Sequence, residues 1–154
     1  MKQIELRRHA PRDPERDALT LDGRSLAANV GASRADVRYD AVFVSPAERA
    51  AETAAWFLRG AGQQLPPSHA VVPGLAGKDA SGGSPEGLAA GLRSLLTELD
   101  EGGRALAISH TPFVERAAFG LTGREVEPMR ELEGIVITQA DDGTISVVEL
   151  RIDR

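Results

Sequence analysis

The sequence contains no cysteine, which excludes disulfide bonds, thiolate metal sites and cysteine nucleophiles. Basic residues are in the minority, with 18 Lys and Arg against 23 Asp and Glu, and the formal net charge is −5. Nucleic-acid-binding proteins are normally basic, so the charge argues against that class. No apolar run approaches the ~20 residues that a membrane-spanning helix needs. The N-terminus also lacks the apolar segment of a signal peptide. We therefore expect a soluble cytoplasmic protein that binds neither nucleic acid nor membrane.

The chain has 154 residues, of which 42% are hydrophobic and 27% charged. This length and composition are typical of one globular domain with a sizeable core. We therefore predict a single domain over residues 1–154, with no linker and no internal repeat.

Short apolar runs alternate with segments of helical periodicity along the chain. The runs predict strands over residues 2–7, 39–44, 69–72, 104–109, 134–140 and 144–152. Asp141-Asp142-Gly143 is a turn sequence, so the last two strands should form an antiparallel hairpin. We expect an α/β protein, a three-layer α/β/α sandwich with a mostly parallel central sheet and a C-terminal antiparallel hairpin.

Four helices are predicted between these strands, each after a serine or threonine that can act as an N-cap. The candidate caps are Thr20, Ser45, Ser84 and Thr111, and the last three precede a proline that suits the first helical position. Several apolar residues are expected to face the core, namely Leu21, Leu26, Ala27, Val30, Ala50, Ala54, Phe57, Leu58, Leu88, Leu92, Leu95, Leu96 and Leu99. Residues 73–83, rich in Gly, Ser and Ala, are predicted to form a mobile loop.

Polar residues follow three of the predicted strands. Arg8-His9 ends the first, Ser45-Pro46-x-x-Arg49 follows the second, and Ser109-His110 ends the fourth. The carboxyl ends of parallel strands meet at one edge of a sheet, where ligands bind. Arginine forks and helix N-termini at that edge favour a multivalent oxyanion such as phosphate.

The same residues resemble a known family. Arg8-His9 followed by a small residue resembles the Arg-His-Gly signature of the histidine phosphatase (phosphoglycerate mutase-like) superfamily. Three further motifs match in order across nearly the whole chain, namely Leu19-Thr20-x-x-Gly23, Ser45-Pro46-x-x-Arg49-Ala50-x-x-Thr53 and Ile108-Ser109-His110. The short length and the Ser-His-x-Pro sequence most resemble the small bacterial phosphohistidine phosphatase branch.

The resemblance implies a role for each matching residue. His9 would attack phosphorus and become phosphorylated, while Arg8, Arg49 and His110 would hold the non-bridging oxygens. The three histidines lie far apart in sequence and cysteine is absent, so we expect no metal site, and we expect no cofactor. It implies a phosphatase for protein phosphohistidine or activated phosphate monoesters. A small-molecule phosphate-ester phosphatase or mutase, and a catalytically idle anion-binding regulatory domain, remain as alternatives. The oligomeric state is not determined.

The sequence departs from the family pattern at two places. Ala10 replaces the usual glycine, where a methyl group either crowds the phosphate or is tolerated. Active esterases of the family carry an acidic residue soon after the third strand, but here Gly74 stands at that position, and no aspartate follows His110. The candidates for a substitute general acid are Asp13, Asp79 and Glu86. Arg7, Arg12 and Arg16 are interpreted as solvated charges, and His69 as an ordinary histidine at a strand edge.

Overall fold

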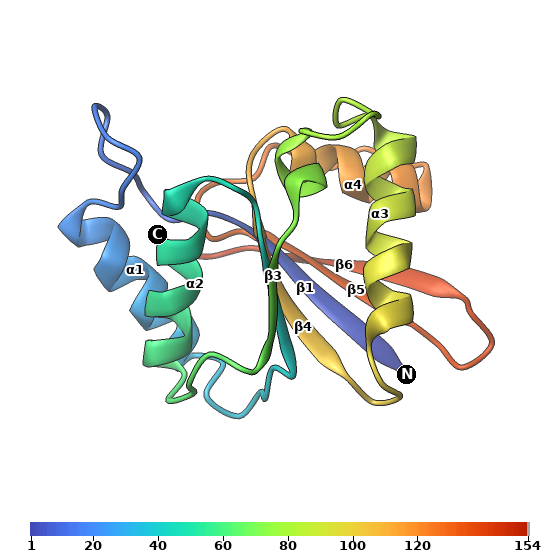
Figure 1. Cartoon of the computed structure of the whole chain (residues 1–154), viewed down its shortest axis with the longest axis horizontal. Helices are drawn as coiled ribbons and strands as arrows, with labels where there is room; N and C mark the ends of the chain where they lie inside the picture. The colour runs from blue at the N-terminus through green and yellow to red at the C-terminus, as the bar shows by residue number, and fades with distance from the viewer. Residues whose placement is uncertain (154) are drawn as a thin grey trace.

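The computed structural model describes residues 1–153 and contains a six-stranded sheet (Figure 1). Its strands are β1 (Lys2–Arg8), β2 (Ala41–Val44), β3 (Ser68–Val71), β4 (Arg104–Ser109), β5 (Gly134–Gln139) and β6 (Ile145–Leu150), in the order β3-β2-β4-β1-β5-β6. The first four strands are mutually parallel, β5 is antiparallel to β1, and β6 is antiparallel to β5. The predicted α/β class, mostly parallel sheet and C-terminal hairpin are confirmed.

Helices cover both faces of the sheet (Figure 1). The four helices are α1 (Leu21–Ala32), α2 (Glu48–Gly60), α3 (Pro85–Glu98) and α4 (Phe113–Thr122), with a short 3₁₀ helix, η1 (Pro73–Ala76), before α3. Helices α1 and α2 enclose one apolar cluster with the sheet, and α3 and α4 enclose another. Within residues 1–153, no helix has both the length and the apolar character needed to cross a membrane.

Two of the four predicted helix caps form. The Thr20 side chain accepts a hydrogen bond from the Gly23 N–H, and the Ser84 side chain accepts one from the Gly87 N–H. The predictions for Ser45 and Thr111 are wrong, because α2 begins at Glu48 and α4 at Phe113. Both side chains have other partners, and one of these contacts belongs to the candidate site.

Helices α1 and α2 approach each other closely. A Cβ atom placed on Gly31 would lie 1.9 Å from the carbonyl oxygen of Phe57, so no larger side chain fits there. The buried positions of α1 are therefore small or compact residues, including Ala27 and Val30. The prediction that Leu21 faces the core is wrong, because its side chain is 78% exposed at the start of the helix.

Arg7 is buried, so its interpretation as a solvated charge is wrong. On the α1–α2 side of β1, its Nε atom lies 2.6 Å from Glu5 Oε2. Glu5 also accepts hydrogen bonds of 2.7 Å from Arg34 and from the Tyr39 hydroxyl. A buried charge requires this kind of pairing, and the partners come from three different segments. Arg12, Arg16 and His69 are exposed, as expected.

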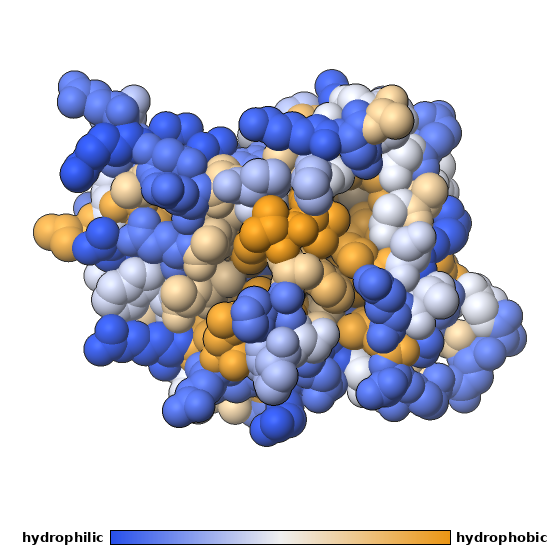
Figure 2. Space-filling model, in the orientation of Figure 1, coloured by the Kyte–Doolittle hydropathy of each residue, from blue (hydrophilic) through white to orange (hydrophobic). Residues whose placement is uncertain are grey.

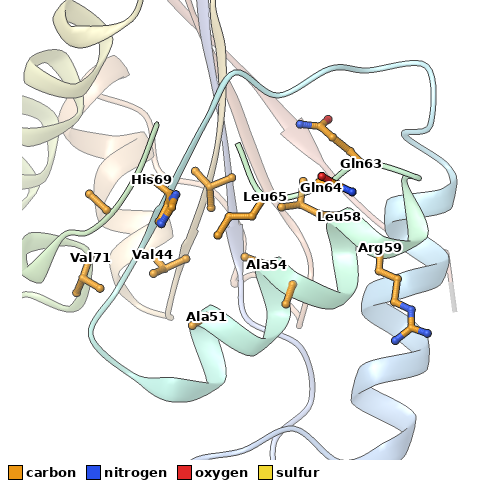
Figure 3. A pocket seen from close by; sticks show the side chains of 13 residues that line it. Val44, Ala51, Ala54, Leu58, Arg59, Gln63, Gln64, Leu65, His69 and Val71 are labelled. Atoms are coloured by element: carbon orange, nitrogen blue, oxygen red, sulfur yellow. The ribbon is translucent and has the colours of Figure 1, made fainter. Parts of the chain in front are cut away.

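The edge strand β3 is exposed along its whole length. Figure 2 shows apolar side chains gathered over β3 and along the neighbouring side of α2. Between these elements lies a cavity of about 540 Å³, lined by residues that include Val44, Ala54, Leu65 and Val71 (Figure 3). None of the histidines or arginines predicted to bind an anion lines this cavity. Its walls are largely apolar.

Candidate active site

The sheet order brings His9 and His110 together. Strands β1 and β4 are parallel neighbours, with Arg8 opposite Ser109, so each histidine follows its strand at the same edge. The His9 N–H donates to the Ser109 carbonyl oxygen, and the two imidazole rings lie 5.1 Å apart between centroids. Both rings are largely buried. The adjacency follows from the parallel pairing of β1 with β4.

The hydrogen bonds of His9 define which ring nitrogen is free. Its Nδ1 atom lies 2.7 Å from the Ala10 carbonyl oxygen, and a carbonyl only accepts, so Nδ1 carries the proton. The Nε2 atom therefore has a lone pair facing Arg49, whose Nε lies 3.4 Å away. Burial is the main cause that lowers the pKa of His9, and the charges of Arg49 and Arg8 lower it further. A neutral imidazole with an unprotonated Nε2 is the state that a nucleophile needs.

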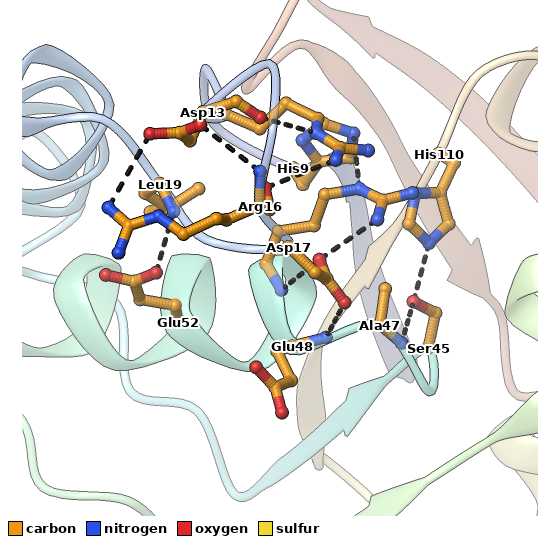
Figure 4. A network of polar contacts seen from close by, with 12 residues as sticks. His9, Asp13, Arg16, Asp17, Leu19, Ser45, Ala47, Glu48, Glu52 and His110 are labelled. Atoms are coloured by element: carbon orange, nitrogen blue, oxygen red, sulfur yellow. Dashed lines mark hydrogen bonds and ion pairs between the residues drawn. The ribbon is translucent and has the colours of Figure 1, made fainter.

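His110 is held between a serine and an arginine. Arg49 Nη2 lies 3.4 Å from His110 Nδ1, and Ser45 Oγ lies 2.6 Å from Nε2 (Figure 4). Because the guanidinium only donates, Nδ1 accepts and the proton lies on Nε2, which donates to Ser45. Burial, with His9 and Arg49 beside it, lowers the pKa of His110 to about 4. Ser45 thus serves His110 rather than the helix start.

Arg49 is the side chain that connects both histidines. It is the second residue of α2 and donates toward His9 and toward His110. Its Nη1 atom also forms an ion pair of 3.0 Å with Asp17 Oδ1. A guanidinium in this position has the bidentate geometry that suits a phosphate group.

Asp17 is a site residue that the sequence reasoning missed. It lies in the loop before α1, and its carboxylate accepts hydrogen bonds from the backbone N–H groups of Glu48 and Arg49 (Figure 4). Asp17 therefore caps α2, whose N-cap residue Ala47 has no side-chain hydrogen bond. Burial opposes its charge, but these hydrogen bonds lower the pKa of Asp17, which stays ionised. Its only sequence signal is an acidic residue in an arginine-rich loop.

Arg8 is the last residue of β1 and directly precedes His9. Its positive charge contributes to lowering the pKa of His9 and the pKa of His110. Its Nη1 atom donates to the Met129 carbonyl oxygen at 2.9 Å and lies 3.9 Å from Glu131 Oε1. Its Nε atom is buried and has no hydrogen-bond partner in the described part of the chain. The side chain as a whole is 24% exposed, so an anion at this edge can reach the guanidinium.

The candidate general acids lie in different surroundings. Asp13 accepts a hydrogen bond from the Glu15 N–H, which lowers its pKa and keeps it ionised. Glu86 lies in the first turn of α3. A Cβ atom placed on Gly74 would lie only 2.7 Å from Asp79 Oδ2, so the Asp79 carboxylate lies against that glycine. Asp79 is thus the carboxylate beside the position where the family resemblance predicts an acid.

Two further features concern the room in the site. Ala10 is fully buried, its methyl group belongs to the apolar cluster beneath α1 and α2, and its N–H donates to Thr53 Oγ1 at 3.0 Å.

The loop predicted over residues 73–83 begins with η1, whose Leu75 carbonyl oxygen accepts a hydrogen bond from Ser109. Among residues 1–153 there is no cluster of three or more His, Asp or Glu side chains that could hold a metal ion.

The low pKa of His110 predicts a loss of stability in mild acid. The unfolded chain takes up this proton near pH 6.5 and the folded chain only near pH 4, so the unfolded state binds more protons between these values. The free energy of unfolding should fall by about 2 kcal/mol from His110 alone between pH 7.5 and pH 5. Urea unfolding of the wild type and of His110→Gln measures this difference. The exposed His69→Gln is the matched control, and an equal pH dependence in all three proteins would contradict the prediction.

Comparison with known proteins finds matches to this chain both in sequence and in fold. Residues 6–76 match the model of the histidine phosphatase superfamily (branch 1). No curated protein matches the chain significantly. Among solved structures, the protein histidine phosphatase SixA complexed with tungstate is 25% identical, with a TM-score of 0.74 over 97% of this chain and 96% of that one.

Two less similar structures share the fold. A phosphoglycerate mutase from Bacillus anthracis str. Sterne is 14% identical, with a TM-score of 0.77 over 96% of this chain and 92% of that one. A phosphoserine phosphatase from Entamoeba histolytica is 16% identical, with a TM-score of 0.75 over 98% of this chain and 97% of that one. The arrangement of strands and helices described above is therefore shared by proteins with several different activities.

Proposed function

Because the chain belongs to the histidine phosphatase superfamily, we propose that it is a phosphatase that forms a covalent phosphohistidine intermediate on His9. The observation that carries the proposal is the environment of His9 Nε2. This atom is unprotonated, and it faces Arg49, which also contacts His110. We take residues 1–154 as one catalytic domain that needs no metal or cofactor.

The proposed reaction has two steps. His9 Nε2 attacks phosphorus, the N–P bond forms, and the bond to the leaving group breaks with its electron pair. Water then attacks the phosphohistidine, which releases inorganic phosphate and restores the neutral imidazole. Arg8 and Arg49 offset the negative charge of the transferring phosphoryl group. His110 has an unprotonated Nδ1 in the free site, so it holds a non-bridging oxygen after taking up a proton beside the bound dianion. Such electrostatic stabilisation is the main source of rate in phosphoryl transfer.

The proposed substrates are protein phosphohistidine and activated phosphate monoesters. Support comes from the similarity to SixA, whose structure is described as that of a protein histidine phosphatase with bound tungstate, an oxyanion. The leaving groups of these substrates need little protonation, which suits a chain with glycine at position 74. One observation favours a small-molecule ester phosphatase instead, namely the Asp79 carboxylate that lies against Gly74.

The direct test is turnover of an aryl phosphate together with trapping of the phosphoenzyme. A phosphohistidine survives alkali and is lost in acid, whereas a phosphoserine behaves in the opposite way. Phosphate bound covalently at His9 after a brief incubation supports the proposal. Binding of inorganic phosphate without any turnover would instead favour an idle anion-binding domain.

Arg49→Ala is expected to lower kcat/KM for an aryl phosphate by about 10²-fold, because one preorganised donor to the transition state is lost. Inhibition by inorganic phosphate should weaken in the same variant. Arg49→Lys should recover only part of both losses, since lysine lacks the bidentate fork. Arg59→Ala, an exposed position on the same helix, is the control. Unchanged phosphate affinity in Arg49→Ala would remove this residue from the site.

A further inference from the structure

We propose that Glu115 is a positioning residue for Arg8, an inference that rests on the phosphate-binding role of Arg8 proposed above. Glu115 is the third residue of α4 and does not belong to any of the motifs that carry the family resemblance. Its carboxylate lies between two segments that supply the candidate site. One segment is the start of α4 after His110, and the other is the loop over residues 128–132.

The connection from Glu115 to Arg8 passes through one peptide unit on each side of Met129. Glu115 Oε2 accepts a hydrogen bond of 3.0 Å from the Met129 N–H. The Met129 carbonyl oxygen accepts the 2.9 Å hydrogen bond from Arg8 Nη1. Met129 itself is 2% exposed, so water has little access to replace these contacts. Glu115 therefore holds the residue that orients the guanidinium.

The carboxylate is itself held from the other side. Thr111 directly follows His110 in the sequence, and its hydroxyl donates to the same Oε2 atom of Glu115. The second oxygen, Oε1, is buried and has no hydrogen-bond partner among residues 1–153. An unsatisfied buried oxygen costs free energy and calls for an explanation. The other oxygen, Oε2, is the acceptor for both the Met129 N–H and the Thr111 hydroxyl, which ties the start of α4 to the residue that orients Arg8.

Fixing the orientation of the Arg8 guanidinium lowers the entropy cost of binding an anion. One Nη atom donates to Met129, so the guanidinium is held at one end, and the side chain stays 24% exposed, which leaves room for an anion to reach it. An arginine side chain has many rotamers, and fixing it before substrate arrives removes that ordering cost from binding. Loss of the Glu115 contact leaves the Met129 N–H without its acceptor and loosens the peptide that orients Arg8.

The test compares Glu115→Met, which keeps the size of the side chain and removes its acceptors, with Glu115→Gln, which keeps one acceptor oxygen for Met129 and Thr111. Glu115→Met should lower kcat/KM for an aryl phosphate by about 10–100-fold, the scale expected for misplaced catalytic groups. It should also weaken binding of inorganic phosphate, measured by calorimetry. Glu115→Gln should stay close to the wild type. Glu98→Met, an exposed position on α3, controls for the chemical change.

A double-mutant cycle with Arg8→Ala distinguishes this inference from the proposed function. If Glu115 acts through Arg8, Glu115→Met should add nothing once Arg8 is removed. Wild-type phosphate affinity and turnover in Glu115→Met, with both lost in Arg8→Ala, would overturn the inference and leave the function standing. So would full additivity of the two losses. Unchanged phosphate binding and turnover in Arg8→Ala would overturn the role of Arg8 and the inference together.

Discussion

His9→Ala is expected to reduce turnover of an aryl phosphate by at least about 10⁴-fold, because removal of a covalent nucleophile abolishes the first chemical step. Phosphoenzyme should no longer form. Binding of inorganic phosphate should largely persist, since Arg8, Arg49 and His110 remain in place. A steady-state assay, phosphoenzyme trapping and calorimetry on the same preparation measure the three quantities.

The matched control for this variant is His69→Ala, because His69 is exposed on the edge strand β3 and lies outside the cluster around His9. Its turnover should equal that of the wild type. If His9→Ala keeps its rate, His9 is not the nucleophile. If the wild type binds phosphate but neither the wild type nor His69→Ala turns over any aryl phosphate, the idle anion-binding domain becomes the better interpretation.

The rate of hydrolysis should fall steeply as the pKa of the leaving group rises. Expelling an alkoxide needs a proton in the transition state, and a positioned acid contributes typically ~10²–10⁴-fold. Phosphohistidine and activated aryl phosphates need far less help. A series from nitrophenyl phosphate to sugar phosphates should therefore lose about that factor beyond the intrinsic reactivity of the esters.

Asp79→Asn provides the matched variant for this series, because asparagine keeps the shape of the side chain beside Gly74 and cannot donate a proton as an acid. If no carboxylate supplies the proton, the wild type and Asp79→Asn should follow the same steep line. A flat series in the wild type that becomes steep in Asp79→Asn would identify Asp79 as the general acid. The small-molecule ester phosphatase would then be the better function.

Much of the fold and the core of the site could be predicted because the responsible signals act over a few residues. Thr20 and Ser84 cap helices through an N–H three residues further on, and apolar runs identify the buried strands. His9 and His110 end parallel strands, and parallel strands place their carboxyl ends at one edge. The shared edge therefore follows from the parallel strands, and the direct pairing of β1 with β4 makes the two histidines neighbours.

Other features depend on how distant segments pack. Asp17 caps α2 from a position 31 residues before Glu48, and Ser45 binds a histidine 65 residues away instead of capping its own helix. Arg7 pairs with Glu5 on its own strand, but its guanidinium also donates to the Leu132 carbonyl oxygen, which lies 125 residues away. These contacts are invisible to local patterns, since the sequence shows which groups need a partner but not which segment brings one.

Local sequence patterns are enough to predict the order of strands and helices, and they identify His9, His110, Arg8 and Arg49 as side chains at the edge of the sheet where the candidate site lies. Only the tertiary structure decided the state and alignment of those side chains. Burial, the hydrogen bonds that the histidines donate to Ala10 and Ser45, and the hydrogen bond that His110 accepts from Arg49 define the proton positions on both histidines, and Met129 orients Arg8. The two groups of features differ in the sequence distance over which they arise. Strand and helix signals act between residues close in the sequence, whereas desolvation and side-chain hydrogen bonds exist only once distant loops are packed together.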